Sequence, residues 1–153
     1  MIKSHLCTTL VILTAISVPL VAHAQSTCTV SASGINFGVM SLQNTTNVDS
    51  TGTVQVFCSR GTVRYTVLLS SGGGSVPQRR MIANGRFLNY NIFTNPGYTQ
   101  VWGDGAAGGT TVAGTANQNN PGSHTLYGRV PLASIQGAYS GIYTDSLVVT
   151  ISY

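Results

Sequence analysis

The feature that most constrains this chain is an alternation of apolar and polar residues in short runs separated by turn residues. In the run 62–70, Val63, Tyr65 and Val67 fall on one face and polar side chains on the other, which is typical of a half-buried strand. The same period of two recurs along most of the chain. Predicted strands cover 28–40, 53–58, 62–70, 86–94, 98–102, 124–131 and 139–153, and predicted loops cover 43–50, 70–77 and 113–121.

The amino-acid composition disfavours helices. Beyond residue 24 the chain contains neither Lys nor Glu, two of the better helix formers, whereas Gly, Thr, Ser, Val and Asn are frequent. Short strands, frequent turns and the lack of a helical period predict an all-β sandwich or barrel. No internal repeat and no linker is visible, so we expect a single domain.

The N-terminus has the pattern of a secretory signal peptide. Lys3 supplies a positive charge, residues 6–21 form an uncharged apolar run, and residues 22–24 (Ala-His-Ala) present small residues at a cleavage site. We expect removal of residues 1–24 and export of a domain formed by residues 25–153. A retained anchor is the alternative, but the run is short for a span of roughly 20 residues. No later stretch has spanning length, so we expect no membrane span in the mature chain.

Export also bears on the cysteines. Cys7 would leave with the signal peptide, so Cys28 and Cys58 would remain in an oxidising compartment. Two cysteines allow one pairing, and we expect a disulfide, with two free thiols as the alternative. On the chain-entropy estimate a bridge closing a loop of this length stabilises the fold by about 3–4 kcal/mol.

The C-terminal run predicts an apolar strand face made of Leu147, Val149, Ile151 and Tyr153. The sequence ends inside this predicted strand, with no turn or further strand after it. A sandwich that ends in this way can lack a partner for an edge strand, and an unpaired edge is a site for adding a strand from another chain. These side chains are expected in the core whether or not such an edge exists.

Groups suited to catalysis or metal binding are few. His124 is the one histidine after residue 24, and no second His, free Cys or Glu is present to complete a metal site. Asp104 and Asp145 could join it in a Ser-His-Asp triad, but the sequence has no Gly-x-Ser-x-Gly elbow. We interpret Asp104 as a turn residue and Asp145 as the start of the last strand. A hydrolase would lose activity on replacement of His124 with alanine. We expect no catalytic residue, no metal and no cofactor.

A phosphate loop and a nucleic-acid surface are also disfavoured. The glycines 72–74 are followed by no Lys-Ser/Thr pair and precede no helix. The arginines are scattered, and only Arg79 and Arg80 are adjacent, so no basic stripe is visible. Weak attraction to anionic surface polymers fits this distribution better than nucleic acid does.

Aromatic residues leave a second hypothesis open. Trp102, Tyr98, Phe93 and Tyr127 could form a sugar-binding platform, and Trp102 and Tyr98 are the candidates for surface recognition. Packing of these rings in a sandwich core is the alternative that we favour. A platform would make the protein a self-complete carbohydrate- or surface-binding module, recognisable by glycan binding in a monomer whose sheet is already closed.

Several motifs together resemble the spore coat protein U domain, which includes subunits of archaic, Csu-type chaperone–usher pili. Each motif is short, but their order and spacing match over essentially the whole chain after residue 24. The motifs are the stretch 28–38 (CTVSASGINFG), Cys58, Arg80-Met81, 88–93 (LNYNIF), 101–105 (VWGDG), 127–131 (YGRVP) and 141–153 (GIYTDSLVVTISY).

The resemblance implies an incomplete immunoglobulin-like β-sandwich that lacks its final strand. A periplasmic chaperone would supply a strand during export, an outer-membrane usher would assemble the fibre, and the next subunit would replace the chaperone strand. By this resemblance Leu147, Val149, Ile151 and Tyr153 would line an acceptor groove, and Cys28 and Cys58 would join the first strand to the second. The mature protein would pass through the periplasm to the cell surface or a pilus.

The sequence departs from a polymerising pilin in one respect. Cleavage after Ala24 would leave only residues 25–27 before Cys28. A donor strand needs roughly ten extended residues at about 3.3 Å each. We therefore expect a chain that accepts a strand but does not donate one. It would lie at a fibre tip, serve as an accessory subunit, or act as a non-fibrous coat protein.

Overall fold

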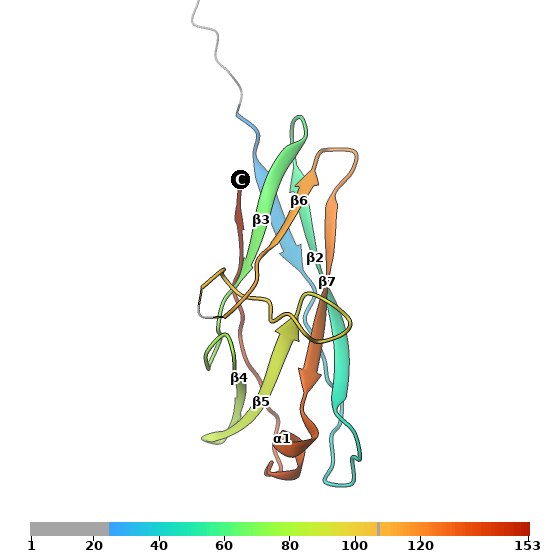
Figure 1. Cartoon of the computed structure of the whole chain (residues 1–153), viewed down its shortest axis with the longest axis vertical. Coiled ribbons are helices and arrows are strands. Elements are labelled where there is room, and N and C mark those ends of the chain that lie inside the picture. Colours follow the sequence, from blue (N-terminus) through green and yellow to red (C-terminus); the bar gives the residue numbers. More distant parts are fainter. Residues whose placement is uncertain (1–24, 107) are drawn as a thin grey trace, which may run out of the picture.

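The computed structural model describes residues 25–106 and 108–153, and the predicted signal peptide lies outside the described residues. These residues form an elongated molecule of two packed β-sheets with one short helix at one end (Figure 1). The elements are β1 (Cys28–Ala32), β2 (Val48–Cys58), β3 (Val63–Leu69), β4 (Arg79–Ala83), β5 (Arg86–Phe93), β6 (Val112–Ala116), β7 (Gly122–Val130), α1 (Leu132–Gln136) and β8 (Val149–Ser152).

All strand pairs are antiparallel. One sheet has the order β1-β2-β7-β5-β4 and the other the order β6-β3-β8. The prediction of an all-β sandwich is confirmed. Strands β1 and β8 each lie at an edge, and they belong to different sheets.

The core lies between the two sheets and follows the alternation seen in the sequence. Val54 and Val56 of β2 and Val67 of β3 have no exposed surface, whereas the residues between them face outward. The loop after β5 adds Trp102, whose indole N–H donates to the Val67 carbonyl (3.2 Å). Burial of these side chains is the main favourable contribution to such a fold.

A buried arginine joins the core to two loops. Arg79 of β4 has no exposed surface. Its Nη1 donates to Asn91 Oδ1 (2.6 Å), and its Nη2 donates to the carbonyls of Ser70 (2.7 Å) and Trp102 (2.7 Å). Its Nε also donates to the Ser70 carbonyl (3.0 Å). The guanidinium therefore satisfies main-chain acceptors that neither sheet pairs.

The structure departs from the predicted elements in several places. The predicted strand 139–153 is a strand only over β8, because the residues before it lack a continuous partner and Thr144 pairs with Ile82 only in an isolated bridge. The predicted strand 98–102 likewise has only isolated bridges. β4 was not predicted, β6 lies almost wholly in the predicted loop 113–121, and β2 begins inside the predicted loop 43–50. α1 begins after Pro131, whose extended backbone precedes the first helical turn.

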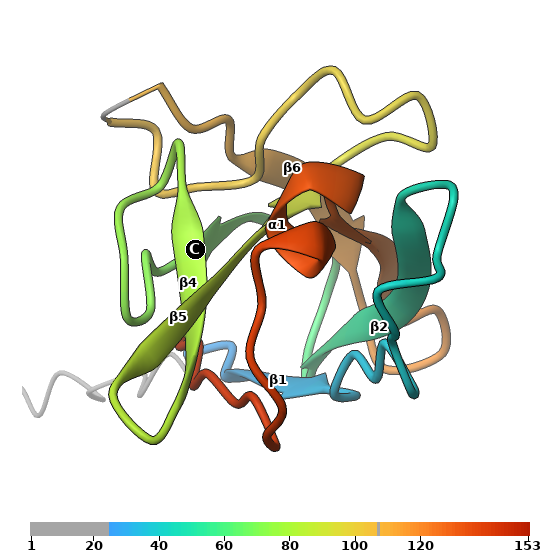
Figure 2. The ribbon, with the colours of Figure 1, turned by 90° about the horizontal axis from the view of Figure 1, so that it is seen from below.

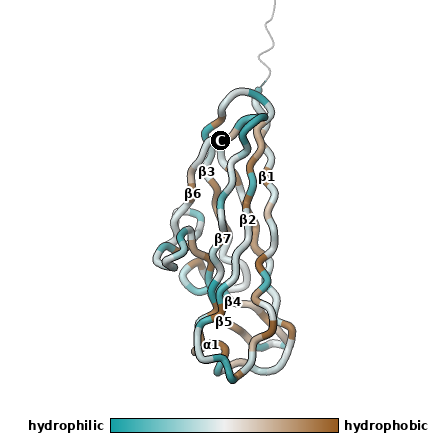
Figure 3. The backbone as a smooth tube through the Cα atoms, turned by 90° about the vertical axis from the view of Figure 1, so that its right-hand side faces the viewer, coloured by the Kyte–Doolittle hydropathy of each residue, from teal (hydrophilic) through white to brown (hydrophobic). Residues whose placement is uncertain are grey.

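No helix in residues 25–106 and 108–153 is long and apolar enough to cross a membrane. Figure 3 shows hydrophobic stretches near the end of the molecule that carries α1. Three strongly exposed apolar side chains belong to this end, namely Val39, Leu42 and Ile142.

Candidate strand-accepting groove

An open groove separates two stretches of chain that are far apart in sequence. Residues 32–42 form one wall, and residues 138–149 form the other. Figure 2 shows the red segment leaving α1 and passing toward the blue strand β1 along one side of the sandwich. The groove has two contiguous compartments, with cavity volumes of about 360 and 860 Å³. Both compartments are lined by Ile35, Phe37, Met81, Tyr143 and Thr144.

The groove lies where the two sheets have unpaired edges. Within residues 25–106 and 108–153, β1 pairs only with β2, and β8 pairs only with β3. Among the described residues, no backbone hydrogen bond joins 32–42 to 138–149. The outer edges of both sheets therefore present peptide groups toward the same gap, and such groups can be satisfied by a strand placed between them.

Apolar side chains along the gap pack against the core but stay partly exposed. Ile151 of β8 is opposite Val67 of β3, yet Val67 is fully buried and Ile151 only half-buried. The same contrast holds for Val149, whose partner Leu69 is 2% exposed. Half-buried apolar side chains on the two walls are Ile35, Phe37, Met40, Ala138, Tyr143, Leu147 and Val149. Covering them would remove further apolar surface from water.

The residues predicted for the acceptor groove are only partly together in it. Leu147 and Val149 line the smaller compartment. Ile151 packs against the core beyond that lining, and Tyr153 is 56% exposed after the end of β8. The facing wall, residues 32–42, was not predicted as part of the groove. The sequence did contain an indication of this wall, because Ile35, Phe37 and Val39 alternate with polar or small residues. We interpreted that alternation as the continuation of the first strand.

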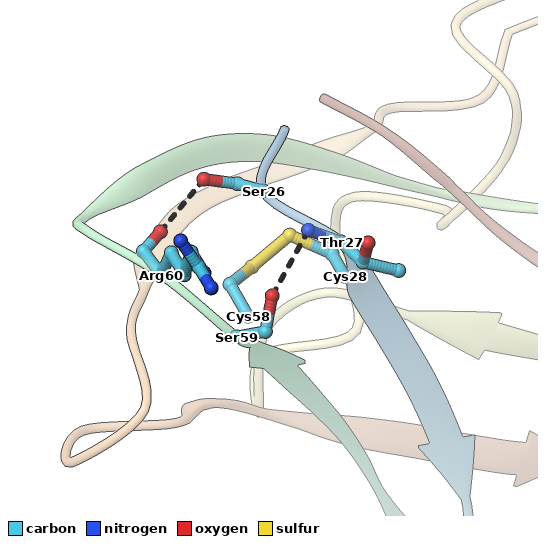
Figure 4. The surroundings of a disulfide bond; sticks show 6 residues. All are labelled: Ser26, Thr27, Cys28, Cys58, Ser59 and Arg60. Carbon is cyan, nitrogen blue, oxygen red and sulfur yellow. Dashed lines mark hydrogen bonds between the residues drawn. A yellow bond between two sulfur atoms is a disulfide. The ribbon is translucent and has the colours of Figure 1, made fainter. Parts of the chain in front are cut away.

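A disulfide fixes the edge strand that flanks this wall. Cys28 and Cys58 are directly opposite in the β1–β2 pair and are joined by a bond across 30 residues (Figure 4). Beside it, the Thr27 N–H donates to Ser59 Oγ (3.1 Å) and Ser26 Oγ donates to the Arg60 carbonyl (2.8 Å). The predicted pairing of these cysteines is confirmed, and it holds one end of β1 against β2.

The two candidates for surface recognition have different environments. Trp102 is 1% exposed, so its ring is not on the surface, and its packing in the core explains why it cannot contribute to a platform. Tyr98 is half-buried, with a left-handed backbone (φ 54°). Its ring contacts Phe93 edge-on (5.5 Å between centroids), and the Arg129 guanidinium lies 3.5 Å from its centroid.

The groups considered for catalysis are not brought together. His124 Nε2 is hydrogen-bonded to the Tyr65 hydroxyl (2.8 Å), and burial lowers the pKa of its imidazole from the ordinary value. Asp104 accepts from the Ala106 N–H (2.9 Å) within its turn, as a turn residue does. Asp145 precedes β8 and contacts Tyr90 rather than His124. The described residues contain no group of three or more His, Cys, Asp or Glu side chains that could hold a metal ion.

Comparison with known proteins identifies the family. The model of the Spore Coat Protein U domain matches residues 13–150. The chain belongs to the Spore Coat Protein U domain family. This assignment confirms the family resemblance drawn from the sequence motifs. No curated protein matches the chain.

A solved structure has a similar fold. It is the crystal structure of the CsuC–CsuE chaperone–tip adhesion subunit pre-assembly complex from the archaic chaperone–usher Csu pili of Acinetobacter baumannii. The similarity covers 84% of this chain at 23% sequence identity, with a TM-score of 0.59. This chain spans only 40% of the matched chain. At this identity the likeness concerns the fold of the domain.

Proposed function

We propose that this protein is an exported structural subunit of a chaperone–usher pilus or surface coat, and that it accepts a β-strand from another chain. The observation that carries the proposal is the apolar groove between the unpaired edges of β1 and β8. The role is structural rather than catalytic.

An extended peptide fits this groove better than a small ligand does. A strand can bond to the free edge of β8 through its main chain while alternate side chains enter the apolar floor. The floor is made by residues of both sheets, among them Met81 and Ile92 of the five-stranded sheet and Leu69 of the three-stranded sheet. A strand in this position would cover the half-buried residues Leu147 and Val149.

The proposed partners are a periplasmic chaperone, an outer-membrane usher and other pilus subunits. Support comes from the family and from the fold shared with a protein solved in a chaperone–tip adhesion subunit complex. Export through the periplasm to the cell surface would follow from the predicted signal peptide.

The proposal extends to the position in an assembly. Cleavage after Ala24 would leave residues 25–27 ahead of β1, too few to fill a groove of this length in a neighbour. A distal tip or accessory position is therefore proposed for a fibre. A coat protein of the same domain type would need no donor segment.

A charge in the groove is expected to weaken strand acceptance strongly. The probe is a synthetic peptide of about 12 residues in which valine and threonine alternate, roughly 40 Å long when extended. At a concentration a hundred times its dissociation constant, it should stabilise the wild-type protein by about 2.7 kcal/mol. Leu147→Asp should weaken peptide binding about 100-fold, because binding would bury an unpaired carboxylate. Thermal shift and fluorescence anisotropy measure both effects.

Val148→Asp is the matched control. Val148 is adjacent to Leu147 but is 64% exposed on the opposite side of the chain. The affinity of the Val148→Asp variant for the peptide should stay within about twofold of the wild-type affinity, since an exposed substitution of this kind has little effect on the fold. Equal losses in the two variants, or a wild-type protein that no such peptide stabilises, would count against the proposed function.

A further inference from the structure

The C-terminal wall of the groove is held in place with little strand pairing. Residues 139–148 make up most of the 138–149 wall, precede β8 and form one face of both compartments. Thr144 exchanges two backbone hydrogen bonds with Ile82 (2.9 and 3.2 Å). Val148 bonds to Ser70 through its N–H (to Oγ, 2.9 Å) and its carbonyl (from the Ser70 N–H, 3.0 Å). Asp145 lies between these two anchors.

The Asp145 carboxylate is saturated by donors from three places. Its Oδ2 accepts from the Tyr90 hydroxyl (2.7 Å) on β5, which is 6% exposed. Its Oδ1 accepts from the N–H groups of Gly73 (2.9 Å) and Ser146 (2.8 Å). The side chain thus joins the wall to the five-stranded sheet and to the loop after β3. Both of its oxygens already accept hydrogen bonds from donors of this chain.

The loop opposite Asp145 leaves room for the carboxylate. Gly72 has a left-handed backbone (φ 59°), and a Cβ at this position would collide with the Asp145 carboxylate. A Cβ at Gly73 would lie 3.4 Å from Oδ1. A side chain at Gly72 would therefore displace Asp145, whereas the contact at Gly73 is an ordinary van der Waals distance. The glycine at position 72 and the aspartate thus fit one another.

The buried guanidinium of Arg79 lies near the Asp145 contacts. Arg79 is directly opposite Tyr90 in the β4–β5 pair, and it donates to the Ser70 carbonyl (2.7 Å). Ser70 in turn bonds to Val148. The Asp145 contacts and the Arg79–Ser70–Val148 contacts therefore fix the wall at neighbouring points on one rigid part of the fold.

We propose that Asp145 is a positioning residue that holds the C-terminal wall in its strand-accepting place before a donor arrives. This inference rests on the proposed function. A wall that is already in place does not have to be ordered when the donor strand binds, so binding costs less conformational entropy. The apparent affinity equals the intrinsic affinity multiplied by the fraction of molecules whose wall is in place. The carboxylate acts on the wall and not on the donor strand.

Replacing Asp145 with asparagine tests this role. Asparagine keeps the shape but offers one carbonyl oxygen and an amide group that is itself a donor, so it cannot accept all three bonds. Peptide binding, measured at a temperature where the variant is folded, should weaken about tenfold. Tyr90→Phe should produce a smaller loss, and the double variant should lose less than the two single losses combined. Asp104→Asn alters a comparable turn contact of a residue that does not line the groove and should leave binding unchanged.

Amide hydrogen exchange gives a readout that does not depend on the peptide. In Asp145→Asn, residues 139–148 should exchange at least about tenfold faster than in wild type, while β2 and β7 are unchanged. Unchanged exchange and unchanged affinity would reject the positioning role. A wild-type protein that binds no peptide would reject the proposed function, and the exchange result would still decide the role of Asp145. If Asp145→Asn does not fold, Tyr90→Phe answers the same question.

Discussion

Replacing Arg79 with alanine is expected to lower the free energy of unfolding by about 3 kcal/mol, because it leaves buried acceptors without donors. The carbonyls of Ser70 and Trp102 receive bonds from this guanidinium, as does Asn91 Oδ1, which would keep a second bond from the Ile92 N–H (2.9 Å). Each buried polar group left unsatisfied costs roughly 1–3 kcal/mol, offset in part by removing a buried charge. Urea unfolding followed by tryptophan fluorescence measures the change, since Trp102 is one of the partners.

Arg80→Ala is the control for this prediction. Arg80 is adjacent in β4 but faces outward, where its guanidinium lies 5.3 Å from the centroid of the exposed Phe87 ring. Its replacement should change the stability by no more than about 0.5 kcal/mol. A stable Arg79→Ala variant would mean that water or neighbouring side chains satisfy the acceptors after the arginine is removed.

Removal of the disulfide is expected to cost about 3–4 kcal/mol through the entropy of the unfolded chain. The bond closes a loop of 30 residues between Cys28 and Cys58. Its loss would also free one end of β1, the edge strand beside the groove, which has no partner other than β2 among the described strands. The Cys28→Ser/Cys58→Ser double variant should therefore lose affinity for a donor peptide as well as stability.

Urea unfolding of the wild-type protein with and without reductant provides the comparison for the double variant. The reduced protein and the double variant should have similar stabilities, because both lack the same constraint. A loss below about 1 kcal/mol would indicate that β1 is held mainly by its ladder with β2 and by packing of Val30, and not by the covalent bond.

The sequence predicted those strands whose alternation reflects burial of one face. The strands β3, β5 and β7 and the second half of β2 lie largely within predicted runs, and the disulfide followed from the presence of two cysteines in an exported domain. β4 was missed because its inward residues include Arg79, which is charged and yet fully buried. β6 was missed because its pairing with β3 depends on small residues, Ala113 and Gly114, that carry no apolar signal.

The groove could be predicted only in part. The alternation of the last strand gave Leu147 and Val149 a shared apolar face, the family resemblance placed that face in an acceptor groove, and both residues line the smaller compartment. The other wall depends on where β1 ends at Ala32, because beyond that residue the chain leaves the ladder with β2. Such an end is decided by tertiary packing and not by local preference. The same holds for residues 139–148, whose place depends on the contacts of Asp145 and Ser70.

Residue-resolved amide hydrogen exchange on the purified monomer is the most direct test of an unpaired edge. Without a donor, those amides of residues 34–40 and 145–151 that donate no hydrogen bond within the chain should exchange rapidly. Addition of the alternating valine–threonine peptide should slow them by about 100-fold or more and leave β2 and β7 unchanged. Slow exchange at both edges in the free monomer would contradict the account, because the molecule's own residues would then already cover the border between β1 and β8.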